Sequence, residues 1–237
     1  MCRVASPNLP VNLPNSFRSR LAVVEKRMKQ AALGFRVHSG WAAVVAVGLE
    51  KGMPSVLARA RVRLVETFSY TFRQPYHTAE KMALEEGRAF IAGVRMEARR
   101  LAQGAIRRLQ SEIPRQGYKL TRCGLLLASG RPLPDLEKVL ASHALIHTAD
   151  GELFREVILH ASERCGLREF TIKDKELLDV AGRTLRVKPA DLLRRAAELG
   201  RPLSAPWSQD EKFAALVAWL ASKAPAKNAF IRREKLR

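Results

Sequence analysis

The stretch Trp41-Ala-Ala-Val-Val-Ala-Val47, with the two segments that follow it, decides the fold of this chain. It is apolar without interruption, which is typical of a strand buried on both faces. A turn bounded by glycine and proline follows at residues 48–54, and over residues 55–66 apolar side chains from Val56 to Leu64 occupy every second position. The positions between them hold Arg59, Arg61 and Arg63. This period of two predicts a half-buried strand with a basic outer row. We expect the two strands to pair as antiparallel neighbours, because the turn between them is short.

The flanking sequence predicts further strands and helices. The first strand is expected over residues 35–49, and aromatic residues at alternate positions predict a third strand over residues 67–73, stopped by Pro75. Downstream, we expect a long helix (78–112), a buried strand (118–129), helices 135–147 and 152–164 separated by a break at 148–151, a short strand (168–173), and helices opening near Pro189 and at the capping-box pattern Ser208-Gln-Asp-Glu211. The apolar stripes of the long helix and of the last helix are Phe90, Val94, Leu101, Ala105 and Leu109, and Phe213, Val217 and Leu220, respectively. The predicted class is α/β, a mixed sheet with antiparallel N-terminal strands and flanking helices.

Charge and composition indicate the domain organisation. The chain of 237 residues has a formal net charge of +19, and its two ends are the most basic parts. Residues 1–36 carry seven Lys or Arg against one acid, and residues 224–237 carry five against one. We expect a basic, partly disordered N-terminal segment (1–33, with a short basic helix over 17–32), a single α/β domain (34–223) and a basic C-terminal tail (224–237).

The same features bear on partners and compartment. Basic ends beside a mildly basic body favour electrostatic contacts with DNA or RNA, although such ends can also bind nothing in particular. The three cysteines, Cys2, Cys123 and Cys165, are too few and scattered for a disulfide framework, and no apolar run approaches the length of a bilayer span. The expected location is therefore the cytoplasm, with no membrane partner.

The histidines and acids of residues 142–156 are the main candidates for chemistry. His143 and His147 are four residues apart, so they share one helical face, and this spacing suits two ligands of a zinc ion. Glu152 or Asp150 beyond the predicted break, or His77 or His38 from elsewhere in the chain, could supply a third ligand. The alternative is that both histidines are core residues packed against Leu136 and Leu140.

Two other groups could carry function. His77 ends the sequence Gln74-Pro-Tyr-His77 at a junction between a strand and a helix, where loops often carry functional groups; a proline turn packed on Tyr76 is the alternative. Arginines on the second strand and the long helix could contact a phosphate backbone: Arg59, Arg61, Arg63, Arg95 and Arg99. They could instead pair with Glu80, Glu85, Glu86 and Glu97. Aromatic residues do not alternate with these arginines in sequence, so any nucleic-acid binding is expected to be weakly sequence-selective.

The order of elements over residues 35–223 resembles the ribonuclease-H-like fold, which many nucleases have and which sugar kinases have in doubled form. The run Ser39-Gly-Trp-Ala-Ala-Val-Val-Ala-Val47 is similar to the first-strand sequence of some uncharacterised bacterial members of that fold. Nucleases of this fold hold two metal ions with carboxylates on the first strand, near the end of the fourth strand and on the last helix. Here only Asp210 and Glu211 match, so the resemblance does not imply two-metal nuclease chemistry.

The sequence therefore predicts nucleic-acid-associated or regulatory binding through basic surfaces, without the standard nuclease carboxylates. Two alternatives stay open. One is a metal-dependent hydrolase with a catalytic cluster of His77, His143, His147 and Glu152, in which a divalent metal would be the cofactor. The other is a non-enzymatic protein-interaction module. Whether the chain is an enzyme is left undecided.

Overall fold

The computed structural model describes residues 28–128 and 132–224. Its centre is a five-stranded sheet with the strand order β3-β2-β1-β4-β5. The strands are β1 (Lys29–His38), β2 (Trp41–Glu50), β3 (Met53–Arg63), β4 (Tyr118–Leu127) and β5 (Arg168–Lys173). β2 is antiparallel to both β1 and β3, whereas β4 is parallel to both β1 and β5. This order and these directions define a ribonuclease-H-like mixed sheet, as the order of elements predicts.

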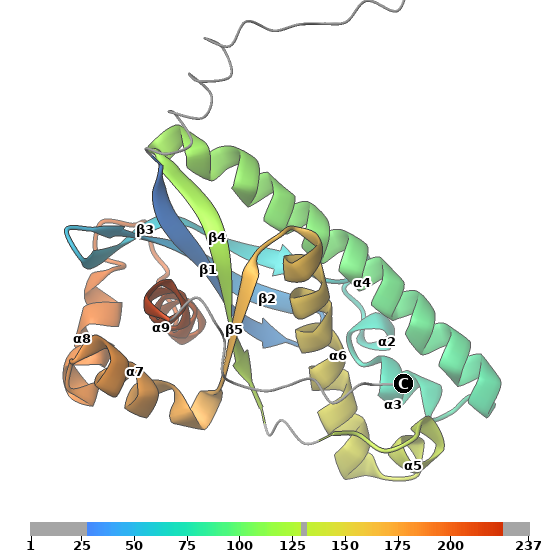
Figure 1. The fold of residues 1–237 in the computed structure, drawn as a ribbon. Coiled ribbons are helices and arrows are strands. Elements are labelled where there is room, and N and C mark those ends of the chain that lie inside the picture. Colours follow the sequence, from blue (N-terminus) through green and yellow to red (C-terminus); the bar gives the residue numbers. More distant parts are fainter. Residues whose placement is uncertain (1–27, 129–131, 225–237) are drawn as a thin grey trace, which may run out of the picture.

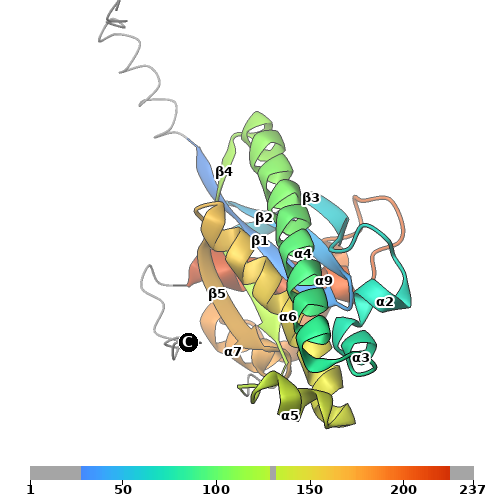
Figure 2. The same ribbon diagram turned by 90° about the vertical axis from the view of Figure 1, so that its right-hand side faces the viewer.

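Helices cover both faces of the sheet (Figures 1 and 2). One face carries α4 (Leu84–Glu112) and α6 (His143–Arg164), with the short helices α2 (Tyr70–Arg73), α3 (Pro75–Ala79) and α5 (Leu136–Leu140) near one end of this layer. The other face carries α7 (Leu177–Leu185), α8 (Pro189–Glu198) and α9 (Gln209–Lys223). Short 3-10 helices occur at Ile113–Gln116 and Asp174–Glu176. No helix within the described residues is long and apolar enough to cross a membrane.

The predicted antiparallel pair is confirmed, because residues 41–47 of β2 pair with residues 56–63 of β3. Lys51 and Gly52 form the turn, with φ angles of 48° and 83°. Two residues with positive φ are what a two-residue hairpin turn of type I′ requires. The prediction that the apolar side chains from Val56 to Leu64 all share one face of the sheet is wrong at Val56. The register shifts between Ala46 and Val47, so Val56 packs with the α9 side of the core while Ala58 and Val62 pack on the opposite side.

Three predictions about the first half of the chain are wrong. Residues 35–49 form parts of two strands, because the chain turns at Ser39 and Gly40, where Gly40 has a φ of 79°. Residues 29–32, expected at the end of a basic helix, begin β1; residues 17–27 of that predicted helix lie outside the described residues. The third strand expected over residues 67–73 is replaced by α2, in which Tyr70 and Phe72 are both exposed, so the alternating aromatic residues do not share a buried face.

The helix break predicted at residues 148–151 is also wrong. The break between the two helices lies earlier, at residues 141–142 between α5 and α6. α6 then continues without interruption through Gly151. Ile146, Ala149 and Leu153 are buried on α6, so the apolar face crosses the glycine and outweighs its low helix propensity. His143, His147 and Asp150 consequently share one continuous helical face.

The helix α9 lies very close to the sheet. A Cβ atom on Gly34 would lie 1.9 Å from the carbonyl oxygen of Ala214, and one on Gly124 would lie 2.6 Å from that of Val217. These two glycines are register partners on β1 and β4. Only residues without a side chain allow this approach. The predicted apolar stripe of α9 is therefore too narrow, since every residue from Ala214 to Ala221 is buried.

Candidate functional site

Three histidines meet beside the ends of α3 and α6. His77 comes from α3, and His143 and His147 come from the first turns of α6. One ligand nitrogen from each lies within 4.8 Å of the others, and the Nε2 atoms of His143 and His147 are 3.0 Å apart. His77 is buried, whereas His143 and His147 are exposed. The structure thus brings the three histidines together, and they could hold a metal ion.

Asp150 fixes the buried histidine of this cluster. Its Oδ2 atom lies 2.5 Å from Nδ1 of His77, and its Oδ1 atom accepts a hydrogen bond of 2.8 Å from the backbone N–H of Tyr76. Because a carboxylate accepts hydrogen bonds, the imidazole proton belongs on Nδ1, which leaves the Nε2 lone pair of His77 free. Burial raises the pKa of Asp150 above its ordinary value, and the hydrogen bonds from His77 and Tyr76 oppose this shift.

A network of ion pairs holds the helices around the cluster. Glu156 of α6 pairs with Arg95 and Arg99 of α4, and Arg95 also donates a hydrogen bond of 3.3 Å to the hydroxyl group of Tyr76. Tyr76, the residue that precedes His77 in the sequence, is buried. The network therefore links α4 and α6 to the segment that carries His77, so the position of His77 relative to α6 does not depend on a free loop.

Glu152 does not join the histidines. It lies on α6 and forms an ion pair of 3.2 Å with Arg155, one turn away. The predicted helix break between the histidines and Glu152 is absent, since α6 is continuous. His38 is not part of the cluster either, because it binds Asp210 elsewhere. The alternative in which His143 and His147 are buried separately in the core is also wrong, as both are exposed and adjacent. The contact of Asp150 with His77 was not predicted, because the expected break at residues 148–151 separated Asp150 from the helix that carries His143 and His147.

A second polar group lies where β1 ends and α9 begins. Asp210 accepts contacts from Nε of Arg36 at 3.0 Å and from Nε2 of His38 at 2.9 Å. Arg36 also pairs with Asp174, directly after β5, at 3.2 Å. A guanidinium group therefore already neutralises the carboxylate at the position where nucleases of this fold hold metal ions. These residues do not fit a two-metal centre.

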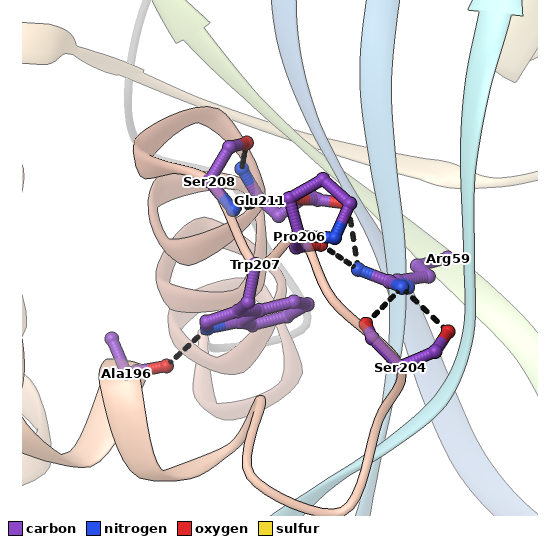
Figure 3. A network of polar contacts seen from close by, with 7 residues as sticks. All are labelled: Arg59, Ala196, Ser204, Pro206, Trp207, Ser208 and Glu211. Carbon is purple, nitrogen blue, oxygen red and sulfur yellow. Dashed lines mark hydrogen bonds and ion pairs between the residues drawn. The ribbon is translucent and has the colours of Figure 1, made fainter.

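The other matching acid, Glu211, belongs to the network in Figure 3. It completes the capping box of α9 with Ser208 and pairs with Arg59 of β3 at 3.1 Å. The Arg59 guanidinium also donates to the backbone oxygens of Ser204 and Pro206, while Nε1 of Trp207 donates to the carbonyl oxygen of Ala196 at 2.8 Å. Arg59 thus fastens the loop before α9 to the edge of the sheet.

The remaining arginines of β3 lie against aromatic rings. Arg61 sits over Trp41, with its Cζ atom 3.8 Å from the ring centroid, and the ring of His38 stacks on Trp41 at 4.4 Å. Arg63 and Arg73 both lie over the ring of Phe68, with their Cζ atoms 5.5 and 4.5 Å, respectively, from the ring centroid. We call Trp41, Arg61, Arg63, Phe68 and Arg73 the arginine–aromatic surface. Sequence reasoning missed it because the rings and arginines come from separate segments.

The five arginines expected to contact nucleic acid thus fall into two groups. Arg59, Arg95 and Arg99 are engaged by Glu211 or Glu156. Arg61 and Arg63 are exposed, and within residues 28–128 and 132–224 neither forms an ion pair with a carboxylate. Glu85 and Glu97, considered as partners for these five arginines, pair instead with Arg88 and Arg100.

Comparison with known proteins finds distant structural likenesses but no sequence match. No protein-family model matches the sequence, and no curated protein matches it significantly. Among solved structures, RuvC of Thermus thermophilus in complex with a Holliday junction substrate is similar with a TM-score of 0.44 and 10% identity, over 80% of this chain and 90% of that chain. A further structure of Thermus thermophilus RuvC is similar with a TM-score of 0.44 and 9% identity, over 80% of this chain and 91% of that one.

A member of the Ppx/GppA family from Aquifex aeolicus has a TM-score of 0.34 and 8% identity, over 75% of this chain and 41% of that chain. With TM-scores below 0.5, these likenesses do not bear on function. The ribonuclease-H-like assignment rests on the strand order and directions described above.

Proposed function

We propose that the protein binds nucleic acid through the arginine–aromatic surface. The observation that carries the proposal is the contact of Arg61 with Trp41, together with the lack of a carboxylate partner for Arg61, Arg63 or Arg73 within the described residues. An arginine held against a ring loses less side-chain entropy when it binds a phosphate, and its planar group offers several N–H donors.

This surface suits the phosphate backbone better than the bases. Trp41 already contacts both His38 and Arg61, and Phe68 contacts Arg63 and Arg73, so the rings support arginines instead of offering a bare stacking platform. Phosphate contacts position a nucleic acid without reading its sequence. Binding should therefore be electrostatic and weakly sequence-selective. The net charge of +19 would speed association with any polyanion.

The test is fluorescence anisotropy with labelled single-stranded and duplex oligonucleotides over a range of salt concentrations. Replacing Arg61 and Arg63 together with Gln removes two phosphate contacts. The slope of log K against log salt should fall by about 1.8 for duplex DNA or about 1.4 for a single strand. The variant Arg61→Lys/Arg63→Lys should keep the slope but bind more weakly, because lysine keeps the charge and loses the planar group.

The matched control is Arg183→Gln/Arg194→Gln. These two arginines are also exposed and lie on α7 and α8, where each pairs with acids of its own helix. The control removes the same charge from another surface and should leave the slope unchanged. Equal effects of the two double variants would show that net charge alone drives binding. Absence of binding at low salt would favour a protein-interaction role.

A further inference from the structure

We propose that His77, His143 and His147 form a three-histidine site for a divalent transition metal of the zinc class, with one coordination position open to water. The proposal is independent of nucleic-acid binding. It rests on the convergence of three imidazoles from two helices, on the carboxylate that orients one of them, and on the exposure of the other two.

The spacing of the nitrogens suits a metal. Zinc–nitrogen bonds of about 2.0–2.1 Å in a tetrahedral arrangement place two ligand nitrogens about 3.3 Å apart. The Nε2 atoms of His143 and His147 are already 3.0 Å apart, and all three ligand nitrogens lie within 4.8 Å of one another. Since His143 and His147 are exposed, rotation of their side chains can close the remaining difference without moving the backbone.

The pair of Asp150 and His77 is the arrangement that metal-bound histidines commonly have. A ligating histidine usually donates its second ring N–H to a carboxylate, which fixes the tautomer and raises the basicity of the ligating nitrogen. Asp150 does this for His77 from a buried position, and its other oxygen is held by the backbone of Tyr76. Asp150 is therefore an orienting group and not a fourth ligand.

The donor set selects the kind of metal. Three neutral imidazole nitrogens suit Zn²⁺ and its neighbours Co²⁺, Ni²⁺ and Cu²⁺, whereas Mg²⁺ and Ca²⁺ prefer oxygen ligands. Glu152, the nearest further acid along α6, is paired with Arg155 and does not complete the set. Three protein ligands leave a fourth position, as in catalytic zinc sites, where the bound water has a pKa of about 7. Such a site could activate water for hydrolysis.

The experiment measures zinc binding by the full chain after treatment with a chelator. Zinc is titrated in competition with a chromophoric chelator, in the presence of excess Mg²⁺. We expect one zinc ion per chain for the unaltered protein and loss of at least about 100-fold in affinity for His143→Ala/His147→Ala. The variant Asp150→Asn should bind zinc with roughly 10- to 100-fold lower affinity and should still bind one ion per chain.

The matched control is His160→Ala, because His160 lies on the same helix outside the cluster. It should bind zinc as the unaltered protein does. Thermal unfolding with and without zinc separates loss of the site from loss of the fold: zinc should raise the midpoint for the unaltered protein and His160→Ala, but not for the double variant. Unchanged zinc binding by the folded double variant, or no stoichiometric binding by the unaltered protein at micromolar zinc, would overturn the proposal.

Discussion

The two faces of the sheet are built differently, although each has a histidine–aspartate pair. On the α9 side, the helix backbone rests on Gly34 and Gly124, and the carboxylate of Asp210 is shared between Arg36 and His38. On the α4–α6 side, large side chains such as Phe35 and Phe154 fill the core. On the α9 side, Asp210 is held by a guanidinium group as well as by its histidine, whereas on the α4–α6 side the imidazole groups of His143 and His147 stay exposed.

The environment of each pair decides what it can do. The side chains of His77 and Asp150 are 8% and 4% exposed, against 37% and 25% for His38 and Asp210. Within the described residues Asp150 forms no ion pair with an arginine, and its hydrogen bonds go to His77 and to the backbone N–H of Tyr76, while Asp210 also balances the charge of Arg36. The same two residue types therefore form an orienting pair at one place and a structural ion-pair network at the other.

Adding a methyl group at Gly34 should break the closely packed face and give the largest effect. The Cβ atom of Gly34→Ala would lie 1.9 Å from a backbone oxygen of α9, which cannot move without displacing the helix. We expect the free energy of unfolding to fall by more than about 3 kcal/mol, measured by urea denaturation.

The control is Gly104→Ala on α4, on the other face of the sheet. Apart from the backbone of its own helix, no atom of the described residues lies within 4 Å of the added Cβ, and the residue is exposed within the helix. This change should stabilise the protein by about 0.5–1 kcal/mol, because alanine is the better helix former. A cost below about 1 kcal/mol for Gly34→Ala would show that α9 is less tightly seated than the distances indicate.

The two aspartates offer the next test of the comparison. Asp150→Ala leaves the N–H groups of His77 and Tyr76 buried without their acceptor, so we expect a loss of about 2–3 kcal/mol in stability. Asp210→Ala should cost about 1 kcal/mol, since Arg36 keeps Asp174 and the half-exposed His38 can bind water. Urea denaturation of both variants at neutral pH measures the difference. Equal losses would mean that the burial of the first pair has no energetic consequence.

The fold was largely predictable from sequence because its signals are local. The apolar run of β2 and the alternation of β3 fix an antiparallel pair whatever surrounds them, and the capping box marks the start of α9. The start of β1 was missed because Lys29 and Gln30 are polar and exposed, and Gly34 carries no side chain. The place of β1 in the centre of the sheet depends on its pairing with β4, which lies far away in sequence.

The candidate sites were predictable only in part. The spacing of His143 and His147 placed them on one helical face, but Gly151 suggested a break that the buried residues of α6 override. The approach of His77 depends on how α3 packs on α6, which no local pattern encodes. The contact of Arg61 with Trp41 likewise arises from strand pairing, so it could not be found by looking for alternating aromatic residues.

Helix capping gives the smallest expected difference between the two faces. Ser208 caps α9 by accepting a hydrogen bond from the backbone N–H of Glu211, whereas the N-cap residue of α4 is Ala83, which provides no side-chain hydrogen bond. Ser208→Ala should therefore cost about 1 kcal/mol, and Ala83→Ser should add about 0.5–1 kcal/mol, because Ala83 already has the extended backbone of a capping residue. The two helices lie on opposite faces of the sheet, so the changes should add, and the double variant should unfold near the unaltered midpoint. Thermal and urea denaturation of the three variants measure this directly. If Ala83→Ser gave no gain, the start of α4 would be held by its packing against α3 and not limited by its unsatisfied N–H groups.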